Sequence, residues 1–486
     1  MLFNSIDFAV FLPVVFFLYW FVTQKSIKLQ NLLLLLASYV FYGWWDWRFL
    51  FLLLIISLVD FFISKRLSVT ENPNARKALL TISIVVDLGI LGFFKYFNFF
   101  QENFISAFSF FGFAIPSNSL NIILPVGISF YTFQSLSYTI DVFRRKLEPA
   151  KRLVDFLAFV SFFPQLVAGP IERATNLLPQ FYTKRTFDYS KAAVGMRQIL
   201  WGLFKKIVIA DNCAIYANLI FNNSTKFSGG GSTLLLGALF FSFQIYGDFS
   251  GYSDIAIGTA KLFGFNLMKN FAFPYFSRDI AEFWRRWHIS LSTWFRDYLY
   301  IPLGGSRNGK LKSIRNTFII FIASGFWHGA NWTFIVWGAL NAIYFLPLLL
   351  TNSNRKNLDV IGQGKIIPSI KESVELVLTF SLTVLAWIFF RSENLGQAFQ
   401  ILSSIFSSSL FTIPNFEGRR DAFVVILLIL LFLLFEWIGR GNEFAIEKTK
   451  IKFLKINLQW VFYSVLVFMI YVFAPVSASN FIYFQF

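Results

Sequence analysis

Residues 422–435 read AFVVILLILLFLLF, a run of fourteen apolar side chains with no polar one among them. Such a run is apolar all round, so it suits a helix that is surrounded by lipid or deeply buried. The basic residues that follow it are Arg440, Lys448, Lys450, Lys452 and Lys455. An apolar run followed by a basic loop is typical of a membrane helix whose loop stays in the cytoplasm.

The composition of the whole chain agrees with this run. Of 486 residues, 56% are hydrophobic and only 14% are charged, and the mean hydropathy is +0.60. A soluble surface normally requires about a quarter of the residues to be charged. Aromatic residues make up 20% of the chain, which suits lipid contact and interfacial belts. A disordered chain, a disulfide scaffold and a soluble dinucleotide-binding enzyme are therefore excluded. The predicted fold class is all-α, a polytopic membrane bundle.

The excess of basic residues is explained by topology. Lys and Arg number 43 and Asp and Glu 26, a net charge of +17. Because the basic residues lie in loops between apolar runs, they predict loop placement and a lipid bilayer as partner rather than nucleic acid. The single cysteine, Cys213, excludes an internal disulfide and a CxxC metal site.

About a dozen segments are expected to enter the membrane. Besides 422–435 they are 6–22, 31–43, 49–64, 79–94, 121–142, 153–169, 196–221, 232–246, 254–267, 316–327, 332–350 and 458–474. Basic loops follow the first, third and fifth of these runs, whereas residues 96–143 contain no Lys or Arg. This alternation predicts that both termini lie outside the cytoplasm. The first run lacks a basic start and a cleavage site, so it is expected to remain as a helix.

One long stretch, 269–315, is basic and aromatic, and we place it on the cytoplasmic side as an amphipathic or re-entrant insertion. It contains nine Lys or Arg and three Asp or Glu residues. The loop with Arg355, Lys356, Lys365 and Lys371 should also be cytoplasmic. The chain between them must then cross an even number of times, so 316–327 and 332–350 form either a re-entrant pair or a tight hairpin.

Only two histidines occur, and an ionisable group within a membrane segment is a functional candidate by default. His328 lies between glycines in GFWHGAN, residues 325–331. From the residues alone it fits a catalytic role and a packing role equally. His288 lies in EFWRRWHISLSTWFRD, residues 282–297. Read as one helix, this segment places Trp284, Trp287 and Leu291 on one face, typical of an interfacial amphipathic helix whose arginines could also grip an anionic donor.

Several common catalytic patterns are missing from the chain. There is no GxSxG elbow, no Walker A loop, no HExxH and no His/Cys metal spacing. No metal site is predicted, although Asp248 and Asp254 remain candidates. Both lie in YGDFSGYSD, residues 246–254, whose glycines predict a bend or a broken helix.

An ordered set of motifs resembles the membrane-bound O-acyltransferase family, on the bacterial branch of alginate O-acetylase and peptidoglycan O-acetyltransferase. The resemblance covers nearly the whole chain, and its strongest part is the pair of histidine motifs. The motifs are LPVGISF at 124–130, FPQLVAGP at 163–170, QIYGDFSGY at 244–252, the segment 283–297 running into YIPLGG at 300–305, GFWHG at 325–329, and Trp337-Gly338.

The resemblance implies a single transmembrane domain over 1–486, with re-entrant or broken helices around a central tunnel. It implies that His328 and His288 are catalytic, and that a cytoplasmic thioester is the donor, acetyl-CoA or an acyl-carrier thioester, with no permanently bound cofactor. The expected donor- or tunnel-lining side chains are Trp284, Arg285, Trp287, Ser290, Asp248 and Trp327. Asn331, or a backbone N–H near Gly329, is a candidate oxyanion donor.

The aromatic ending FIYFQF, residues 481–486, has two interpretations. It is either an interfacial anchor, or Tyr483 relays the acyl group as a covalent nucleophile. An extracytoplasmic acetyltransferase resembling SGNH hydrolases is the expected partner.

Three functions are compatible with these residues and motifs. The first is an integral-membrane O-acetyltransferase of the bacterial cytoplasmic membrane that modifies an extracytoplasmic polysaccharide, either exopolysaccharide or peptidoglycan. The second is D-alanyl transfer to teichoic acid. The third is a transporter or flippase without covalent chemistry, which would usually show repeated halves and paired broken helices.

Overall fold

A computed structural model describes residues 1–111, 120, 122–167, 169–307, 309–447, 456–475 and 481–482. Within these residues all regular structure is helical and no strand occurs, which confirms the predicted class. The chain forms two compact units: Met1–Gly195 with Thr259–Met268, and Met196–Gly258 with Lys269–Phe486.

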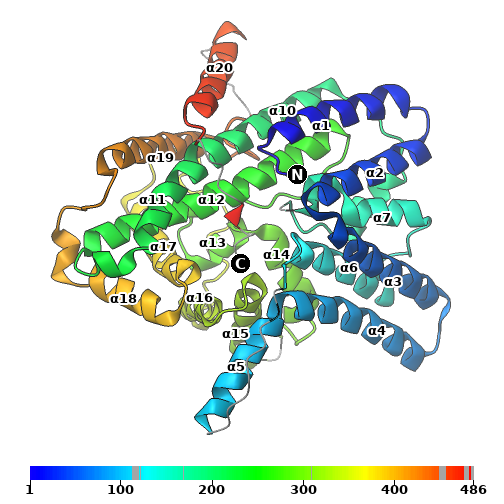
Figure 1. Cartoon of the computed structure of the whole chain (residues 1–486), viewed down its shortest axis with the longest axis horizontal. Coiled ribbons are helices and arrows are strands. Elements are labelled where there is room, and N and C mark those ends of the chain that lie inside the picture. Colours follow the sequence, from blue (N-terminus) through cyan, green and yellow to red (C-terminus); the bar gives the residue numbers. More distant parts are fainter. Residues whose placement is uncertain are drawn as a thin grey trace. The chain divides into compact units, whose positions relative to one another are not determined.

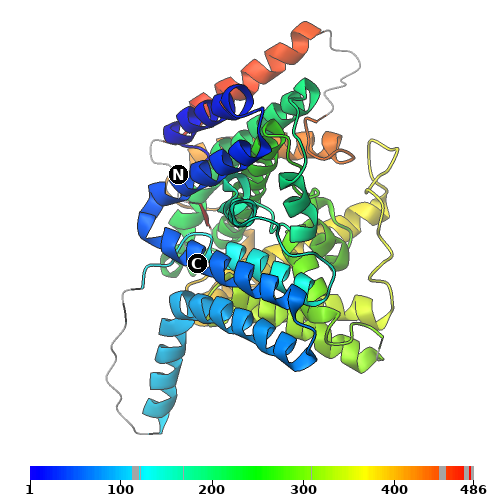
Figure 2. The same cartoon turned by 90° about the vertical axis from the view of Figure 1, so that its right-hand side faces the viewer.

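The first unit is built around three helices that pack side by side, α3, α4 and α6 (Figures 1 and 2). One polar contact joins all three, since the carboxylate of Asp60 on α3 accepts hydrogen bonds from Ser83 on α4 and Ser135 on α6. Polar side chains of this kind hold helices together where no water competes. The helices of this unit are α1 (Ile6–Phe17), α2 (Ile27–Asp46), α3 (Leu50–Val69), α4 (Pro73–Leu91), α5 (Phe97–Phe110), α6 (Ile128–Phe143), α7 (Leu153–Ser161), α8 (Phe163–Leu166) and α9 (Ala174–Leu177).

The second unit contains both histidines. Its helices are α11 (Asp211–Phe221), α12 (Gly231–Leu262), α13 (Ile280–Arg286), α14 (Ile289–Phe295), α15 (Lys310–His328), α16 (Trp332–Leu350), α17 (Ile370–Arg391), α18 (Leu395–Ile405), α19 (Arg419–Gly439) and α20 (Ile456–Val472). Helix α10 (Tyr189–Leu203) enters it from the first unit, and the last turn of α12 belongs to the first unit.

Helices α15 and α16 pack against each other with residues 329–331 between them, as both predicted arrangements require. The choice between a re-entrant pair and a hairpin across the membrane stays a prediction. Two glycines allow the close approach. A Cβ on Gly325 would lie 2.2 Å from the Phe334 carbonyl oxygen, and one on Gly338 would lie 2.4 Å from that of Phe321.

The protein is a multi-pass membrane protein. Among the described residues, six helical segments are long and apolar enough to cross a bilayer: Ile27–Val69, Pro73–Phe110, Gly231–Leu262, Trp332–Leu350, Ile370–Arg391 and Arg419–Gly439. Two shorter apolar helices are Ile6–Val22 and Leu458–Val472. The predicted number of about a dozen membrane segments stays a prediction. Ile370–Arg391 is a span that is absent from the predicted set.

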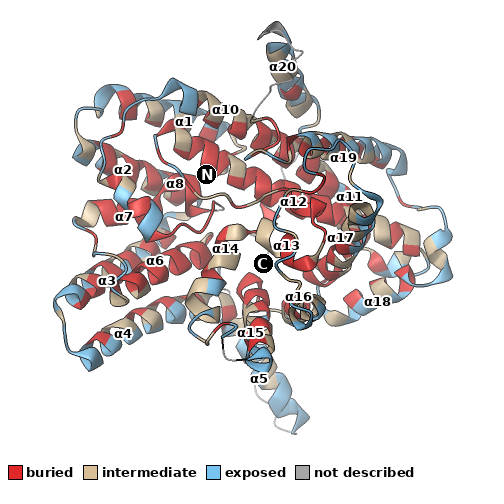
Figure 3. Cartoon of the chain, turned by 180° about the vertical axis from the view of Figure 1, so that it is seen from behind, coloured by how far each residue is buried: buried red, intermediate tan, exposed pale blue. Residues whose placement is uncertain are grey.

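The predicted bend at residues 246–254 is wrong, because α12 runs without a break through both glycines. A Cβ on Gly247 would lie 2.9 Å from the Lys205 carbonyl oxygen, and one on Gly251 would lie 2.8 Å from that of Gly202. The glycines thus serve close helix packing rather than a turn. Helix α12 is a core helix, because 83% of the residues in its apolar 18-residue stretch are buried (Figure 3).

Candidate active site

The segment that carries His288 is two short helices rather than one. Helix α13 starts where Asp279 accepts a hydrogen bond from the Glu282 backbone N–H at 2.7 Å. Trp287 is extended, and His288 adopts the left-handed conformation with φ of 44° before α14 begins. The prediction of one amphipathic helix is therefore wrong. Trp287 and Leu291 are each 1% exposed, so they pack in the protein core instead of facing lipid.

Asn270 holds this break in place. Its carbonyl oxygen accepts from the Ile289 N–H at 2.9 Å, and its side-chain Oδ1 accepts from the Ser290 N–H and from the Ser290 hydroxyl. Nearby, the Ala272 N–H donates to the Arg286 carbonyl at 2.9 Å. A residue outside both helices thus satisfies the backbone groups that a helix break leaves open.

His328 is the last residue of α15. Gly329 follows it in an extended conformation, and a Cβ there would lie 2.1 Å from the ring of Phe334. The glycine therefore makes room for an aromatic ring of α16.

The fold brings the two histidines together. Their ring centroids are 6.4 Å apart, and the side chains belong to residues only 1% exposed for His288 and 3% for His328. Aromatic rings surround both. Phe249 lies edge-on to His288 at 4.6 Å, Trp327 contacts both imidazoles, and Trp337 and Phe390 lie 5.2 and 5.3 Å from His328. Two imidazoles buried among aromatic rings are suited to accepting and donating a proton at a site from which bulk water is excluded.

Burial sets the protonation state of His288. Desolvation lowers the pKa of this histidine to about 3, while a hydrogen bond to its own backbone acts in the opposite direction. The imidazole is therefore neutral near pH 7 and can accept a proton or a hydrogen bond.

Apart from Asp248, the predicted lining residues divide into those near the histidines and those held elsewhere. Trp327 lies against both histidine rings, and Ser290 lies 3.4 Å from His288 Nδ1. Trp287 lies one layer further out, where it packs against Phe271 and Trp387. Trp284 instead donates to Asn341 Oδ1 at 3.2 Å, and Arg285 donates to the carbonyl oxygens of Asn354 and Asn357 at 2.8 and 2.7 Å.

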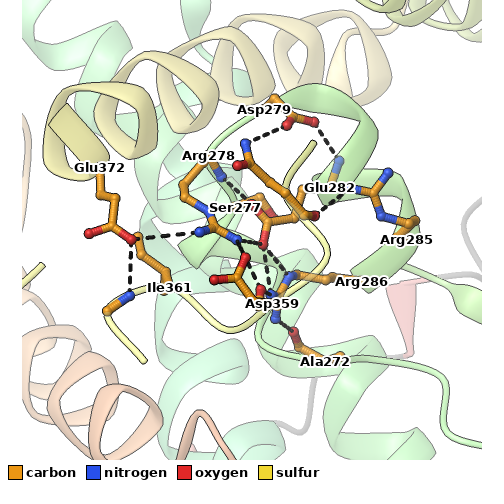
Figure 4. A network of polar contacts seen from close by, with 12 residues as sticks. Ala272, Ser277, Arg278, Asp279, Glu282, Arg285, Arg286, Asp359, Ile361 and Glu372 are labelled. Atoms are coloured by element: carbon orange, nitrogen blue, oxygen red, sulfur yellow. Dashed lines mark hydrogen bonds and ion pairs between the residues drawn. The ribbon is translucent and has the colours of Figure 1, made fainter. Parts of the chain in front are cut away.

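Arg286 of α13 and Arg278, which precedes this helix, are engaged within the protein. Glu282, 1% exposed, accepts from Arg278 at 3.1 Å and from Arg286 at 2.7 Å (Figure 4). Arg278 also pairs with Asp359 at 2.9 Å and lies 3.6 Å from Glu372. These contacts attach α13 to the loop between α16 and α17 and to the start of α17.

Asp248 lies in a buried polar cluster. It pairs with Lys206 at 2.8 Å and accepts from the Ile482 backbone N–H at 2.7 Å. Asp254 pairs with Lys205 at 2.6 Å. In the described part of the chain no group of three His, Cys, Asp or Glu residues is placed to hold a metal ion.

The segment 481–482 reaches into the same unit. Phe481 and Ile482 are at most 1% exposed, and the Phe481 ring lies 4.4 Å from Tyr252 and 6.1 Å from Phe249. Phe249 in turn contacts His288. Tyr483 itself lies outside the described residues.

Asn331 caps α16. Its Oδ1 accepts from the Thr333 N–H at 3.0 Å and its Nδ2 donates to the Glu393 carbonyl at 2.8 Å. Its suggested oxyanion role stays a prediction, and it would require the Nδ2 contact to be given up.

A cavity of about 20 Å³ lies beside Asn270, roughly the room of one water molecule. Lys205, Asp254 and Glu436 are among its lining residues, whereas neither histidine is. The tunnel expected to reach His328 therefore stays a prediction.

Two contributors to the site were missed from the sequence. Asn270 was hidden because no local pattern marks an amide that caps a distant break. Helix α17, which provides Phe390 and Trp387, was missed although residues 376–390 within it form a stretch of fifteen residues without a charged side chain. Its hydropathy was the available signal.

Known proteins resemble this chain over most of its length. A model described as "MBOAT, membrane-bound O-acyltransferase family" matches residues 151–357. The "Probable alginate O-acetylase AlgI" of Pseudomonas aeruginosa is 40% identical over 442 residues, which are 90% of this chain and 81% of that protein. The "Peptidoglycan O-acetyltransferase" of Helicobacter pylori is 37% identical over 436 residues, 83% of this chain and 80% of that protein.

A more distant similarity is to the "Teichoic acid D-alanyltransferase" of Streptococcus thermophilus. It is 29% identical over 289 residues, which are 54% of this chain and 68% of that protein.

Proposed function

The chain belongs to the membrane-bound O-acyltransferase family and is an O-acyltransferase, and from this premise we propose that it moves an acetyl group from a cytoplasmic thioester to an extracytoplasmic polysaccharide, exopolysaccharide or peptidoglycan. The observation that carries the proposal is the buried pair His288 and His328, 6.4 Å apart between aromatic rings. Acetyl is favoured over D-alanyl because the O-acetylases match 83% to 90% of the chain, against 54% for the D-alanyltransferase.

In the proposed reaction, a hydroxyl oxygen attacks the thioester carbonyl carbon while His328 takes the hydroxyl proton. The C–S bond then breaks, and the proton goes to the leaving thiolate. His288 accepts a hydrogen bond within the same site. Exclusion of water by the surrounding rings strengthens both interactions.

The donor in this proposal is acetyl-CoA, with an acyl-carrier thioester as the alternative that shares its chemistry. Transfer proceeds in the bacterial cytoplasmic membrane, with both termini on the outer side, toward an SGNH-hydrolase-like acetyltransferase. The burial of Phe481 beside Phe249 supports a relay through Tyr483, since that tyrosine follows two residues later in the sequence.

The test uses the full chain in liposomes with radiolabelled acetyl-CoA, or with an acetyl- or D-alanyl-loaded carrier protein, and follows thiol release. His328→Ala should lower the rate by a factor of about 10²–10⁴, because general-base catalysis is lost. Ser292→Ala is the matched control: Ser292 lies on α14 and donates to the Trp287 carbonyl. A wild-type rate in His328→Ala refutes the mechanism, and turnover of D-alanyl donor alone refutes the acetyl assignment.

The relay is tested separately. Tyr483→Phe should abolish acetylation of the final polysaccharide in cells. Unchanged polysaccharide acetylation removes the relay and leaves the histidine chemistry intact.

A further inference from the structure

The amide of Asn270 has a defined orientation. The residue is fully buried, and one side-chain atom faces the backbone N–H of Ser290 at 3.3 Å. A backbone N–H can only donate, so the atom that faces it must be the oxygen, Oδ1. The alternative amide orientation would set two donors against each other.

This orientation decides the direction of the Ser290 hydroxyl. Its oxygen lies 2.9 Å from the same Oδ1, which can only accept. The single hydroxyl hydrogen therefore points at Asn270. Ser290 Oγ can then offer only a lone pair to its neighbour His288 Nδ1, at 3.4 Å.

A lone pair facing Nδ1 favours a hydrogen on Nδ1, because two facing lone pairs would repel each other. Because the buried imidazole is neutral, it carries one N–H, and Nε2 is then the ring nitrogen that accepts. The backbone keeps these side chains beside one another, since the Ile289 N–H donates to the Asn270 carbonyl directly after the left-handed His288.

We infer that Asn270 and Ser290 are positioning residues that hold His288 in the Nδ1–H tautomer and so present Nε2 as its accepting nitrogen in the site. The inference rests on the proposed function. It adds two residues that act through His288 and do not themselves touch the reacting atoms.

The test is nitrogen NMR of the full chain in liposomes with ¹⁵N-labelled histidine. The chain has only two histidines, so His328→Gln leaves the signals of His288 alone. Couplings to the ring protons identify the protonated nitrogen. We expect hydrogen on Nδ1 in the wild type. In Asn270→Ala the Ser290 hydroxyl can turn and donate to Nδ1, so the hydrogen should move to Nε2.

Activity gives a second readout. Asn270→Ala and Ser290→Ala should lower kcat about tenfold or more, with the KM for acetyl-CoA unchanged, as expected for a wrong tautomer. Ser290→Thr keeps the hydroxyl and Asn270→Asp keeps the accepting oxygen, so both should retain the Nδ1–H tautomer even if the alanine variants fold poorly. Ser292→Ala should change neither readout.

A wild-type His288 protonated on Nε2 overturns the inference, as does an Asn270→Ala protein whose tautomer and kcat equal those of the wild type. Absence of acetyl transfer in the wild type contradicts the proposed function instead, because the tautomer is measured without substrate.

Discussion

His288 combines two unfavourable features at one residue. Its imidazole is buried, and its backbone has a φ of 44°, a left-handed conformation that only a few per cent of non-glycine residues adopt, with histidine, asparagine and aspartate the most frequent among them. Such features persist only where the surrounding structure imposes them, and they gather at functional sites. Here the imposing contacts come from Asn270, which bonds to both residues that follow the histidine.

The lowered pKa of His288 predicts acid sensitivity. In the folded protein the pKa is about 3, against 6.5 for an ordinary histidine, so the unfolded chain binds the extra proton between these values. The contribution of His288 to the free energy of unfolding is therefore complete above pH 6.5. As the pH falls below 6.5, the free energy of unfolding decreases by up to about 1.4 kcal/mol per pH unit. Thermal unfolding in detergent from pH 7.5 to 4.5 measures this loss.

The comparison protein is His288→Gln, which cannot take up the proton. Its unfolding temperature should fall less steeply with acidification than that of the wild type. Parallel curves for the two proteins would show that His288 does not carry the effect.

At the level of elements, α13 is fastened by one buried carboxylate. Glu282 receives hydrogen bonds from both Arg278 and Arg286, whose side chains are 5% and 12% exposed (Figure 4). Removing one partner of a buried ion pair is costly because the other charges stay buried without compensation.

Glu282→Gln should therefore lower the free energy of unfolding by about 3–5 kcal/mol, measured by tryptophan fluorescence in a denaturant titration. Asp359→Asn is the control, since the Asp359 side chain is 55% exposed although it also contacts Arg278. It should cost at most about 1 kcal/mol. Equal losses in the two variants would contradict the central role of Glu282.

Close packing between α10 and α12 depends on glycine. A Cβ on Gly202 would lie 2.6 Å from the Gly251 carbonyl oxygen and 2.7 Å from Ile255, and backbone at that distance cannot move aside. Gly202→Ala should therefore destabilise the protein by about 1–3 kcal/mol. The measurement is the same denaturant titration.

Gly89 on α4 offers a matched helical glycine, because a Cβ there meets nothing within 4 Å. Gly89→Ala should be neutral or gain up to about 1 kcal/mol. If both alanine variants are equally stable, close packing at Gly202 is not what holds these helices.

For the whole molecule, α17 resolves a question of parity. The basic loops at 355–371 and 440–455 both read as cytoplasmic, which requires an even number of crossings between them. The run 422–435 alone supplies one crossing. Helix α17, with 22 residues and a length of about 33 Å, is long and apolar enough to supply the second.

Cysteine labelling tests this arrangement. Cys213 is a buried free cysteine, so Cys213→Ser provides a background without reactive thiols. Lys356→Cys and Gly441→Cys should react only from the cytoplasmic side, and Glu393→Cys only from the outer side, with a membrane-impermeant maleimide. Labelling of Lys356→Cys and Glu393→Cys from the same side would show that α17 does not cross the membrane.

The sequence by itself determined the membrane class, the all-helical fold and the family, and it singled out both histidines as candidate site residues. Hydropathy over a run such as 422–435 and a motif such as GFWHG are local properties, so they can be read without knowing what lies opposite. The pairing of α15 with α16 could also be predicted, because the basic loops on either side of this pair indicate an even number of crossings between them.

The tertiary structure alone decided which segments meet. The glycines of α12 are compatible with a helix break or with close packing against another helix. They serve close packing, because the backbone of Gly202 and Lys205 lies directly against them. The segment 282–297 has helical periodicity, yet Asn270 satisfies its backbone at Ile289 and Ser290 and so permits the break at Trp287 and His288. The 6.4 Å approach of the two imidazoles depends in the same way on contacts between distant segments, and no local pattern encodes such contacts.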